Sequence, residues 1–231
     1  ASAVLGWAAC KLAPLQSPVA AGPSEGRLFR WRDFGFGLAG YTMFGVGYIG
    51  YMTFVIALLR EQGVEAGRIT LFYALLGVGV VASSRLWARL LDHFKGGQAL
   101  ALLNGLLGLA TLLPAITATW PLVLLSGVVF GCVFLSVVAS TTALVRHNLP
   151  VSQWAAGISA FTTVFAAGQI VGPTVVGWIA DGVGGLERGL VFSACALWLG
   201  AALALRQRGL LQTDAHQEMV NSSKKLVLTI L

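Results

Sequence analysis

Four aromatic residues between positions 41 and 51 offer the most recognition chemistry in the chain. Tyr41, Phe44, Tyr48 and Tyr51 are three or four residues apart, so on an α-helix they share one side. Their hydroxyls and ring faces suit contact with a solute, and we expect them to line a cavity. Helix packing, with the hydroxyls bonded to neighbouring helices, is the alternative, and both stay open. Six glycines between positions 35 and 50 either allow close backbone approach or weaken the helix so that it can bend.

Further polar and aromatic side chains occur in other apolar segments. Asn104 and Gln169 carry amides that are costly in hydrocarbon unless they are partnered. An interhelical hydrogen bond is the favoured role for each, and contact with a ligand is the alternative. Phe130 and Phe134 lie four residues apart on one helical face, where packing is the default role.

Charged residues gather around a short connection near position 90. Arg85 lies about one turn inside an apolar segment, close enough to its end for the guanidinium to reach water. Asp92 follows Arg89 and can pair with a neighbouring Arg or accept hydrogen bonds from a helix N-terminus.

Groups that support catalysis or metal binding are scattered. No CxxC, HExxH or GxxxxGK[ST] pattern occurs, no Ser/His/Asp set is placed for nucleophilic chemistry, and the three Cys and three His residues form no cluster. All nine carboxylates fall in connections, at helix ends or in the tail, and none is predicted deep in a bilayer, where it would mark a proton or ion relay. We therefore predict a protein that is not an enzyme and that holds no metal or other cofactor.

Membrane-spanning helices are the elements that must position these side chains. The chain is 57% hydrophobic and 10% charged, with a mean hydropathy of +0.81, whereas a soluble domain is about 25% charged. Six apolar segments are each long enough to cross about 30 Å of hydrocarbon. Because they are continuously apolar, helices are favoured over barrel strands. The predicted fold class is all-α, with transmembrane helices over residues 34–59, 69–88, 99–117, 122–145, 154–180 and 189–205.

Basic residues are concentrated in alternate connections. By the positive-inside rule the richer set lies in the cytoplasm, which places both ends of the bundle there. The net charge of +6 then reflects orientation in the bilayer, and we expect no nucleic acid partner. The richer set is Arg27, Arg30, Arg32, Arg89, Lys95, Arg146, Arg206 and Arg208, and the poorer set is Arg60, Arg68 and Arg188.

The sequence divides into three parts. Residues 1–33 are expected to hold the end of a preceding helix and a cytoplasmic linker, because an apolar stub is followed by a Pro/Gly/Ser-rich stretch. Residues 34–208 form the six-helix transmembrane bundle, and residues 209–231 form a more polar cytoplasmic tail. We interpret the chain as part of a longer membrane protein, with a complete short protein as the alternative.

Two segments resemble motifs of the major facilitator superfamily. The connection from Ala88 to Gly97 is similar to the cytoplasmic Gly-x-Leu-x-Asp-Arg-x-Gly-Arg-Lys loop of that superfamily, although Ala88 replaces the leading Gly and Lys95-Gly96-Gly97 replaces the Gly-Arg-Lys end. Residues 168–181, with Gly172-Pro173, resemble its eleventh helix. Residues 41–54 are similar to the seventh helix of the YbfB/YjiJ-like branch.

This resemblance implies a secondary transporter of twelve helices, of which this chain supplies the C-terminal six. A missing N-terminal six-helix half would be its partner, and a small-molecule substrate would lie between the halves. The resemblance implies substrate contacts for Tyr41, Phe44, Tyr48 and Tyr51, with Phe130 and Phe134 opposite and Gln169 nearby, and a cytoplasmic gate formed by Asp92 with Arg85 or Arg89. The expected location is a bacterial inner membrane.

Two other function classes remain as alternatives. A self-contained six-helix scaffold or channel-like subunit would carry an apolar stripe suited to self-association. The membrane domain of an ATP-driven exporter would need a nucleotide-binding partner and longer cytoplasmic helix extensions, and the short connections argue against it.

Overall fold

All regular structure in residues 29–210, the part of the chain that the computed structural model describes, is helical. Six of its helices are long and apolar enough to cross a membrane, and these residues contain no strand, which confirms the predicted fold class. The expected preceding-helix end, most of the linker and nearly all of the tail lie outside the described residues. The elements are η1 (Trp31–Phe34), α2 (Gly35–Glu61), α3 (Ala66–Leu86), α4 (Ala88–His93), α5 (Gln98–Ile116), α6 (Trp120–Asn148), η2 (Val151–Gln153), α7 (Trp154–Ala180) and α8 (Gly185–Leu205).

Local sequence accounts for where these helices begin and end. Gly63 after α2 and Gly184 before α8 take positive φ angles of 73° and 102°, which glycine adopts without a Cβ penalty and which make the turns short. Pro121 lies in the first turn of α6, where its missing N–H costs nothing. Pro173 lies inside α7, which continues through it to Ala180. The predicted spans differ from the observed helices by at most four residues at either end.

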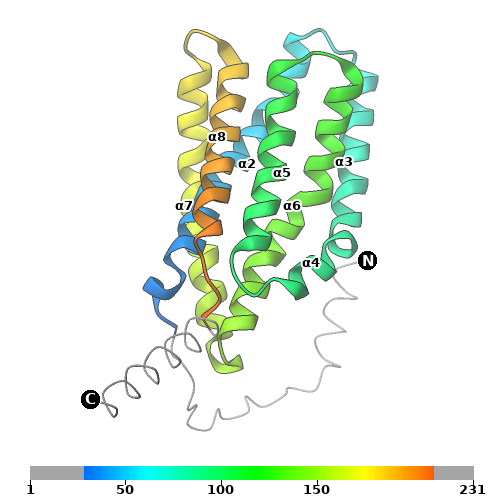
Figure 1. Cartoon of the computed structure of the whole chain (residues 1–231). Coiled ribbons are helices and arrows are strands. Elements are labelled where there is room, and N and C mark those ends of the chain that lie inside the picture. The colour runs from blue at the N-terminus through cyan, green and yellow to red at the C-terminus, as the bar shows by residue number, and fades with distance from the viewer. Residues whose placement is uncertain (1–28, 211–231) are drawn as a thin grey trace, which may run out of the picture.

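The six long helices form an up-and-down bundle in which α2 is central (Figure 1). α2 packs against α8 and α7, α8 also packs against α5, and α5 packs against α6. α3 stands at one side of the bundle against α6, and α7 stands at the opposite side. α3 and α7 are the least buried spans, since 22% and 17% of an 18-residue apolar stretch of each are buried, against 44–56% in the other four.

Pairs of glycines set the close packing of α2. A Cβ added at Gly40 would lie 2.8 Å from the carbonyl oxygen of Gly200 in α8, and one added at Gly45 would lie 2.8 Å from the carbonyl oxygen of Phe165 in α7. The facing glycines, Gly200 and Gly168, are equally crowded by α2. Of the two roles that the sequence left open for the glycines of α2, close backbone approach is therefore the one seen at these positions.

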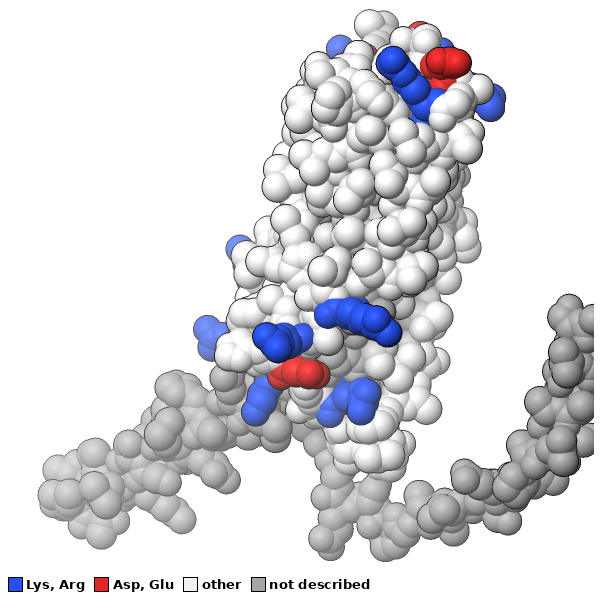
Figure 2. Space-filling view, turned by 90° about the vertical axis from the view of Figure 1, so that its right-hand side faces the viewer, with Lys and Arg blue, Asp and Glu red and all other residues white. Residues whose placement is uncertain are grey.

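Charged side chains gather at the two ends of the bundle and leave an uncharged belt between them (Figure 2). We call the end that carries α4 the lower end and the end that carries Gly63 and Gly184 the upper end, as in Figure 1. Among the described residues the lower end carries eight basic and two acidic side chains, and the upper end carries three basic and four acidic ones. The lower-end residues are Arg30, Arg32, Asp33, Arg85, Arg89, Asp92, Lys95, Arg146, Arg206 and Arg208.

Candidate functional site

The predicted stripe forms on α2, and its rings are closed in. Tyr41, Phe44, Tyr48 and Tyr51 are each at most 6% exposed. Ring centroids are 5.4 Å apart for Tyr41 and Phe44 and 4.9 Å apart for Phe44 and Tyr48, and all three of these rings stack on Phe165 of α7. In this conformation the rings pack against one another instead of facing an open space.

Phe130 and Phe134 of α6 lie opposite the stripe, as the sequence suggested. Phe130 stacks on Tyr51 with ring centroids 4.1 Å apart, and Phe134 lies 5.2 Å from Tyr48. Phe130 is fully buried, whereas Phe134 is only partly buried. The aromatic cluster formed by the α2 stripe, these two residues and Phe165 therefore joins three helices, and Phe134 and Phe165 lie at its more open edge.

Phe161 and Phe165 of α7 complete this cluster, and neither was predicted as a site residue. Phe161 meets Phe34 and Tyr41 edge to face. Phe161, Phe165 and Gln169 are each four residues apart, so they fall on one face of α7. That spacing was the signal in the sequence that identifies the face of α7 turned toward α2.

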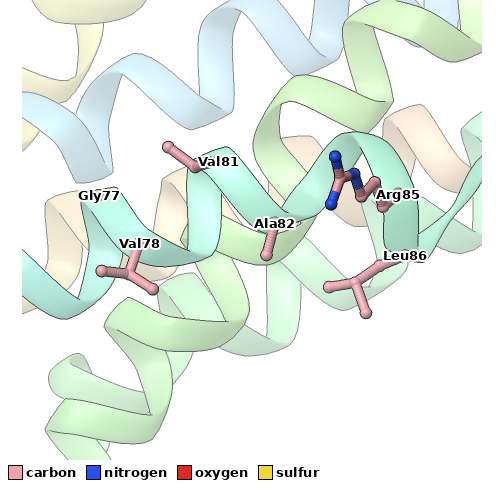
Figure 3. Close-up of a pocket in the computed structure, with 6 residues that line it drawn as sticks. All are labelled: Gly77, Val78, Val81, Ala82, Arg85 and Leu86. Carbon is pink, nitrogen blue, oxygen red and sulfur yellow. The ribbon is translucent and has the colours of Figure 1, made fainter.

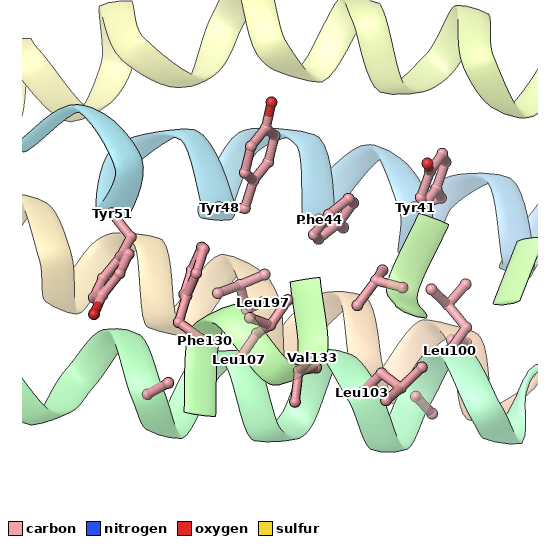
Figure 4. Close-up of a cluster of buried hydrophobic side chains, with 14 of the residues drawn as sticks. Tyr41, Phe44, Tyr48, Tyr51, Leu100, Leu103, Leu107, Phe130, Val133 and Leu197 are labelled. Carbon is pink, nitrogen blue, oxygen red and sulfur yellow. The ribbon is translucent and has the colours of Figure 1, made fainter. Parts of the chain in front are cut away.

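Tyr48 and Gln169 are hydrogen-bonded across the interface of α2 and α7. The side-chain amide of Gln169 donates to the Tyr48 hydroxyl oxygen, and both groups lie beside the Phe134 and Phe165 rings. Figure 4 shows the Tyr48 hydroxyl directed away from the α5 side of the cluster and toward α7. The interhelical hydrogen bond expected for Gln169 is thus present, and its contact with a substrate stays a prediction.

Tyr51 points its hydroxyl in the opposite direction, toward α5 (Figure 4). Its oxygen lies 2.6 Å from Ser126 Oγ, and Ser126 Oγ donates to the carbonyl oxygen of Ala110 at 2.7 Å. Since Ser126 has one hydroxyl proton, Tyr51 is the donor in the first bond. Asn104 is also fully buried, and its amide donates to the carbonyl oxygen of Gly40 at 3.4 Å. In this conformation Tyr51 and Asn104 therefore take part in packing between helices, and a substrate contact for Tyr51 stays a prediction.

The residues expected at the gate lie at the lower end but do not pair. Arg85, Arg89 and Asp92 are all exposed, and no ion pair joins Asp92 to either Arg within residues 29–210. The expected pairing of Asp92 is therefore not seen in this conformation. The physical reason is exposure, because an ion pair between solvated side chains brings about 0–1 kcal/mol. A gating role for the three residues stays a prediction.

α3 presents an exposed apolar face that ends at Arg85. Figure 3 shows the residues of this face on successive turns of the helix. Val78, Val81 and Leu86 are 66%, 79% and 60% exposed, so nothing in the described chain covers them. The face is lined by Gly77, Val78, Val81, Ala82, Arg85 and Leu86.

Over residues 155–167, α7 presents a different exposed face, made mostly of small and hydroxyl-bearing side chains. Ser159, Thr162 and Thr163 are exposed, and the two threonines donate their hydroxyls to backbone carbonyls four residues earlier. Small and hydroxyl-bearing residues are typical of contacts between transmembrane helices. This surface thus fits a neighbouring helix better than it fits lipid chains.

The site offers hydrogen bonding and ring stacking, with every charged side chain of the described residues kept toward the ends of the bundle. Within residues 29–210 no group of three or more His, Cys, Asp or Glu is arranged to hold a metal ion. The uncharged groups at its centre are suited to binding rather than to proton transfer or nucleophilic attack.

Comparison with known proteins assigns the family. The family described as "Uncharacterised MFS-type transporter YbfB" matches residues 2–205, which is most of the chain. No curated protein and no solved structure matches the chain. The matched family is one of transporters rather than enzymes, and its assignment agrees with the six apolar helices of an integral membrane protein. The chain therefore belongs to the YbfB-type family of the major facilitator superfamily of membrane transporters.

Proposed function

We propose that this protein is a secondary active transporter that moves a small solute across the membrane by alternating access, and that this chain supplies the six helices of its C-terminal half. The hydrogen-bonded pair of Tyr48 and Gln169 carries the proposal. It places a polar group inside a membrane-spanning bundle, at the more open edge of the aromatic cluster, where Phe134 and Phe165 are only partly buried.

The exposed faces of α3 and α7 support a second six-helix half. These two helices are the least buried of the six, and they stand at opposite sides of the bundle (Figure 1). The hydroxyl-bearing face of α7 has the composition of a helix contact. A partner half seated against both helices would cover the face where Tyr48 meets Gln169 and would place the substrate between the halves.

The chemistry of the aromatic cluster favours a neutral, amphipathic or anionic small molecule as substrate. No carboxylate of the described residues lies near the cluster to neutralise a dication. Ring faces and a hydroxyl–amide pair recognise flat or apolar groups with a few hydrogen-bonding atoms. Tyr41, Phe44, Tyr48, Tyr51, Phe130, Phe134 and Gln169 are the proposed substrate-facing set, of which Tyr51 is the most fully committed to packing.

The lower end is the proposed cytoplasmic side, in the inner membrane of a bacterium. Its excess of basic side chains fits the positive-inside rule, and both ends of the described bundle lie there. Arg85, Arg89 and Asp92 would close this side when the transporter opens outward. Their exposure here fits a conformation in which that closure is not made.

Cysteine labelling tests alternating access without knowledge of the substrate. In the full-length protein with Cys10, Cys132 and Cys195 replaced by Ser, Tyr48→Cys is treated with a membrane-impermeant maleimide in right-side-out and inverted vesicles. We expect labelling, because the cycle opens the cluster to water and maleimides react with hydrated thiolates.

Leu197→Cys is the matched control for this experiment. Leu197 packs against Gly47 on α2, next to Tyr48 in sequence, and it is fully buried against the α8 side of the bundle. It is expected to stay unlabelled. Absence of labelling at Tyr48→Cys from both sides, or equal labelling of both variants, would contradict the proposed substrate path.

The exposed apolar face of α3 favours one other function, a six-helix scaffold that self-associates. That face would then bury itself against a second copy. Cross-linking of Val81→Cys in native membranes separates the two functions, since a scaffold gives a homodimer band and the transporter gives none.

A further inference from the structure

We infer that the lower end holds a binding site for an anionic phospholipid, formed where the chain turns back after α8. The site is an open pocket of about 650 Å³, within the size range of ligand pockets. It is lined by Asp33, Phe36, Leu205, Arg206, Gln207, Arg208 and Leu210. The inference depends on the protein's place in the membrane and not on the proposed transport.

Gln207 fixes the shape of this pocket. Its side chain is 4% exposed, accepts a hydrogen bond from the backbone N–H of Gly37 at 3.0 Å and donates to the carbonyl oxygen of Asp33 at 2.9 Å. Its own carbonyl oxygen accepts from the N–H of Gly97 at 2.9 Å. These bonds tie the segment after α8 to the beginnings of α2 and α5.

A second amide anchors the same segment three residues later, at Leu210. Asn148, at the end of α6, accepts a hydrogen bond from the N–H of Leu210 at 2.6 Å and donates to the carbonyl oxygen of Lys95 at 2.7 Å. The segment from Arg206 to Leu210 is therefore held at both ends and cannot swing freely in water.

The two arginines of the pocket are exposed, whereas Gln207 between them is buried. Arg206 and Arg208 therefore project away from the bundle while Gln207 projects into it. Asp33 also lines the pocket and carries one negative charge. The two guanidinium groups leave the pocket with an excess of positive charge, which complements a phosphate group.

Apolar side chains continue from the arginines toward the uncharged belt of the bundle. Phe36 and Leu205 are 46% and 63% exposed, at the lower ends of two membrane-spanning helices. Trp31, 53% exposed in the preceding turn, is the residue type that marks the headgroup level of a bilayer. Positive charge at the headgroup level next to exposed apolar surface at the chain level matches a phospholipid, whereas free phosphate would leave Phe36 and Leu205 uncovered.

Lipid titration of the purified full-length protein tests the site. The delipidated protein is titrated with phosphatidylglycerol and with phosphatidylcholine, and bound lipid is counted by native mass spectrometry. Each arginine near an anionic surface contributes roughly a factor of five in affinity, so we expect Arg206→Gln/Arg208→Gln to weaken phosphatidylglycerol binding by about 30-fold. Phosphatidylcholine binding should change little.

Arg85→Gln/Arg89→Gln is the matched control, because it removes the same charge from the same end outside the pocket. It should leave the tightest phosphatidylglycerol site intact. Arg206→Lys/Arg208→Lys keeps the charge and should retain most of the binding, which separates loss of the site from misfolding. Phe36→Ala should weaken binding of long-chain phosphatidylglycerol more than that of a short-chain analogue.

Three results would overturn the inference. One is wild-type protein that binds phosphatidylglycerol no better than phosphatidylcholine. Another is an equal loss of binding in the matched control, which would mean that general charge attraction suffices. The third is a melting temperature of Arg206→Gln/Arg208→Gln that is lowered equally with and without added lipid. The two arginines would then contact another segment of the protein instead of a lipid.

Discussion

Replacing Tyr51 by Phe removes one hydroxyl from a fully buried position. It tests the chain of two hydrogen bonds from Tyr51 to Ser126 and from Ser126 to the Ala110 carbonyl. Ser126 keeps its bond to the Ala110 carbonyl in this variant, so no buried donor loses its partner. The expected cost is that of one hydrogen bond between transmembrane helices, about 0.6–1.7 kcal/mol of unfolding free energy.

Replacing Ser126 by Ala is expected to cost more. The Tyr51 hydroxyl then has no acceptor in a site that is 0% exposed, and a buried polar group without a partner costs about 1–3 kcal/mol. In the double variant the orphaned hydroxyl is gone as well. The two changes together should therefore cost less than the sum of the single changes, by about 1 kcal/mol or more.

Reversible unfolding in mixed detergent micelles, followed by tryptophan fluorescence, measures these differences. Tyr73→Phe is the matched control, because Tyr73 is only partly buried and its hydroxyl has no hydrogen-bond partner in the described part of the chain. It should change stability by less than about 0.5 kcal/mol. If the double variant loses the sum of the two single losses in unfolding free energy, within about 0.3 kcal/mol, the hydrogen-bond chain from Tyr51 through Ser126 is refuted.

Two further predictions concern packing. Gly200→Ala should destabilise the protein by about 1–3 kcal/mol, because its new Cβ would lie 2.8 Å from the Gly40 carbonyl oxygen. Gly105 has open space around it, so Gly105→Ala should be neutral or stabilising. Thermal unfolding of both variants measures the difference, and equal midpoints would contradict the prediction. Asn148→Ala should release the Leu210 amide and speed its hydrogen exchange while that of Leu107 is unchanged; unchanged exchange at Leu210 would show that the hydrogen bond does not hold this segment.

The fold could be predicted from the sequence because long apolar runs have few alternatives in a membrane. Helical periodicity also fixes which side chains share a face, so the stripe from Tyr41 to Tyr51 is on one side of α2 as expected. Whether that side meets water or another helix depends on tertiary packing. The rings of Phe161 and Phe165 cover this side of α2, and the sequence around position 41 does not predict that contact.

The lower end shows what reasoning from the sequence leaves open. Asp92 could pair with a neighbouring Arg or accept from a helix N-terminus, and in this conformation it is exposed and pairs with neither Arg85 nor Arg89 in the described part of the chain. Gln207, after α8, and Asn148, at the end of α6, tether this end, and isolated amides give no periodic signal. Their partners are backbone groups far away in sequence, which only the folded chain brings together.

The paired glycines of α2 have a consequence for movement. Because its backbone touches α8 at Gly40 and Gly200 and touches α7 at Gly45 and Gly168, α2 cannot tilt or slide without a collision of carbonyl oxygens against Cα atoms. We expect α8 and α7 to move together with α2 where these glycines meet, so the aromatic cluster would open at the contacts of Phe44 and Tyr48 with Phe134 of α6. Distances between spin labels placed on α2 and α8 near these glycines should then stay constant when other helices of the bundle move.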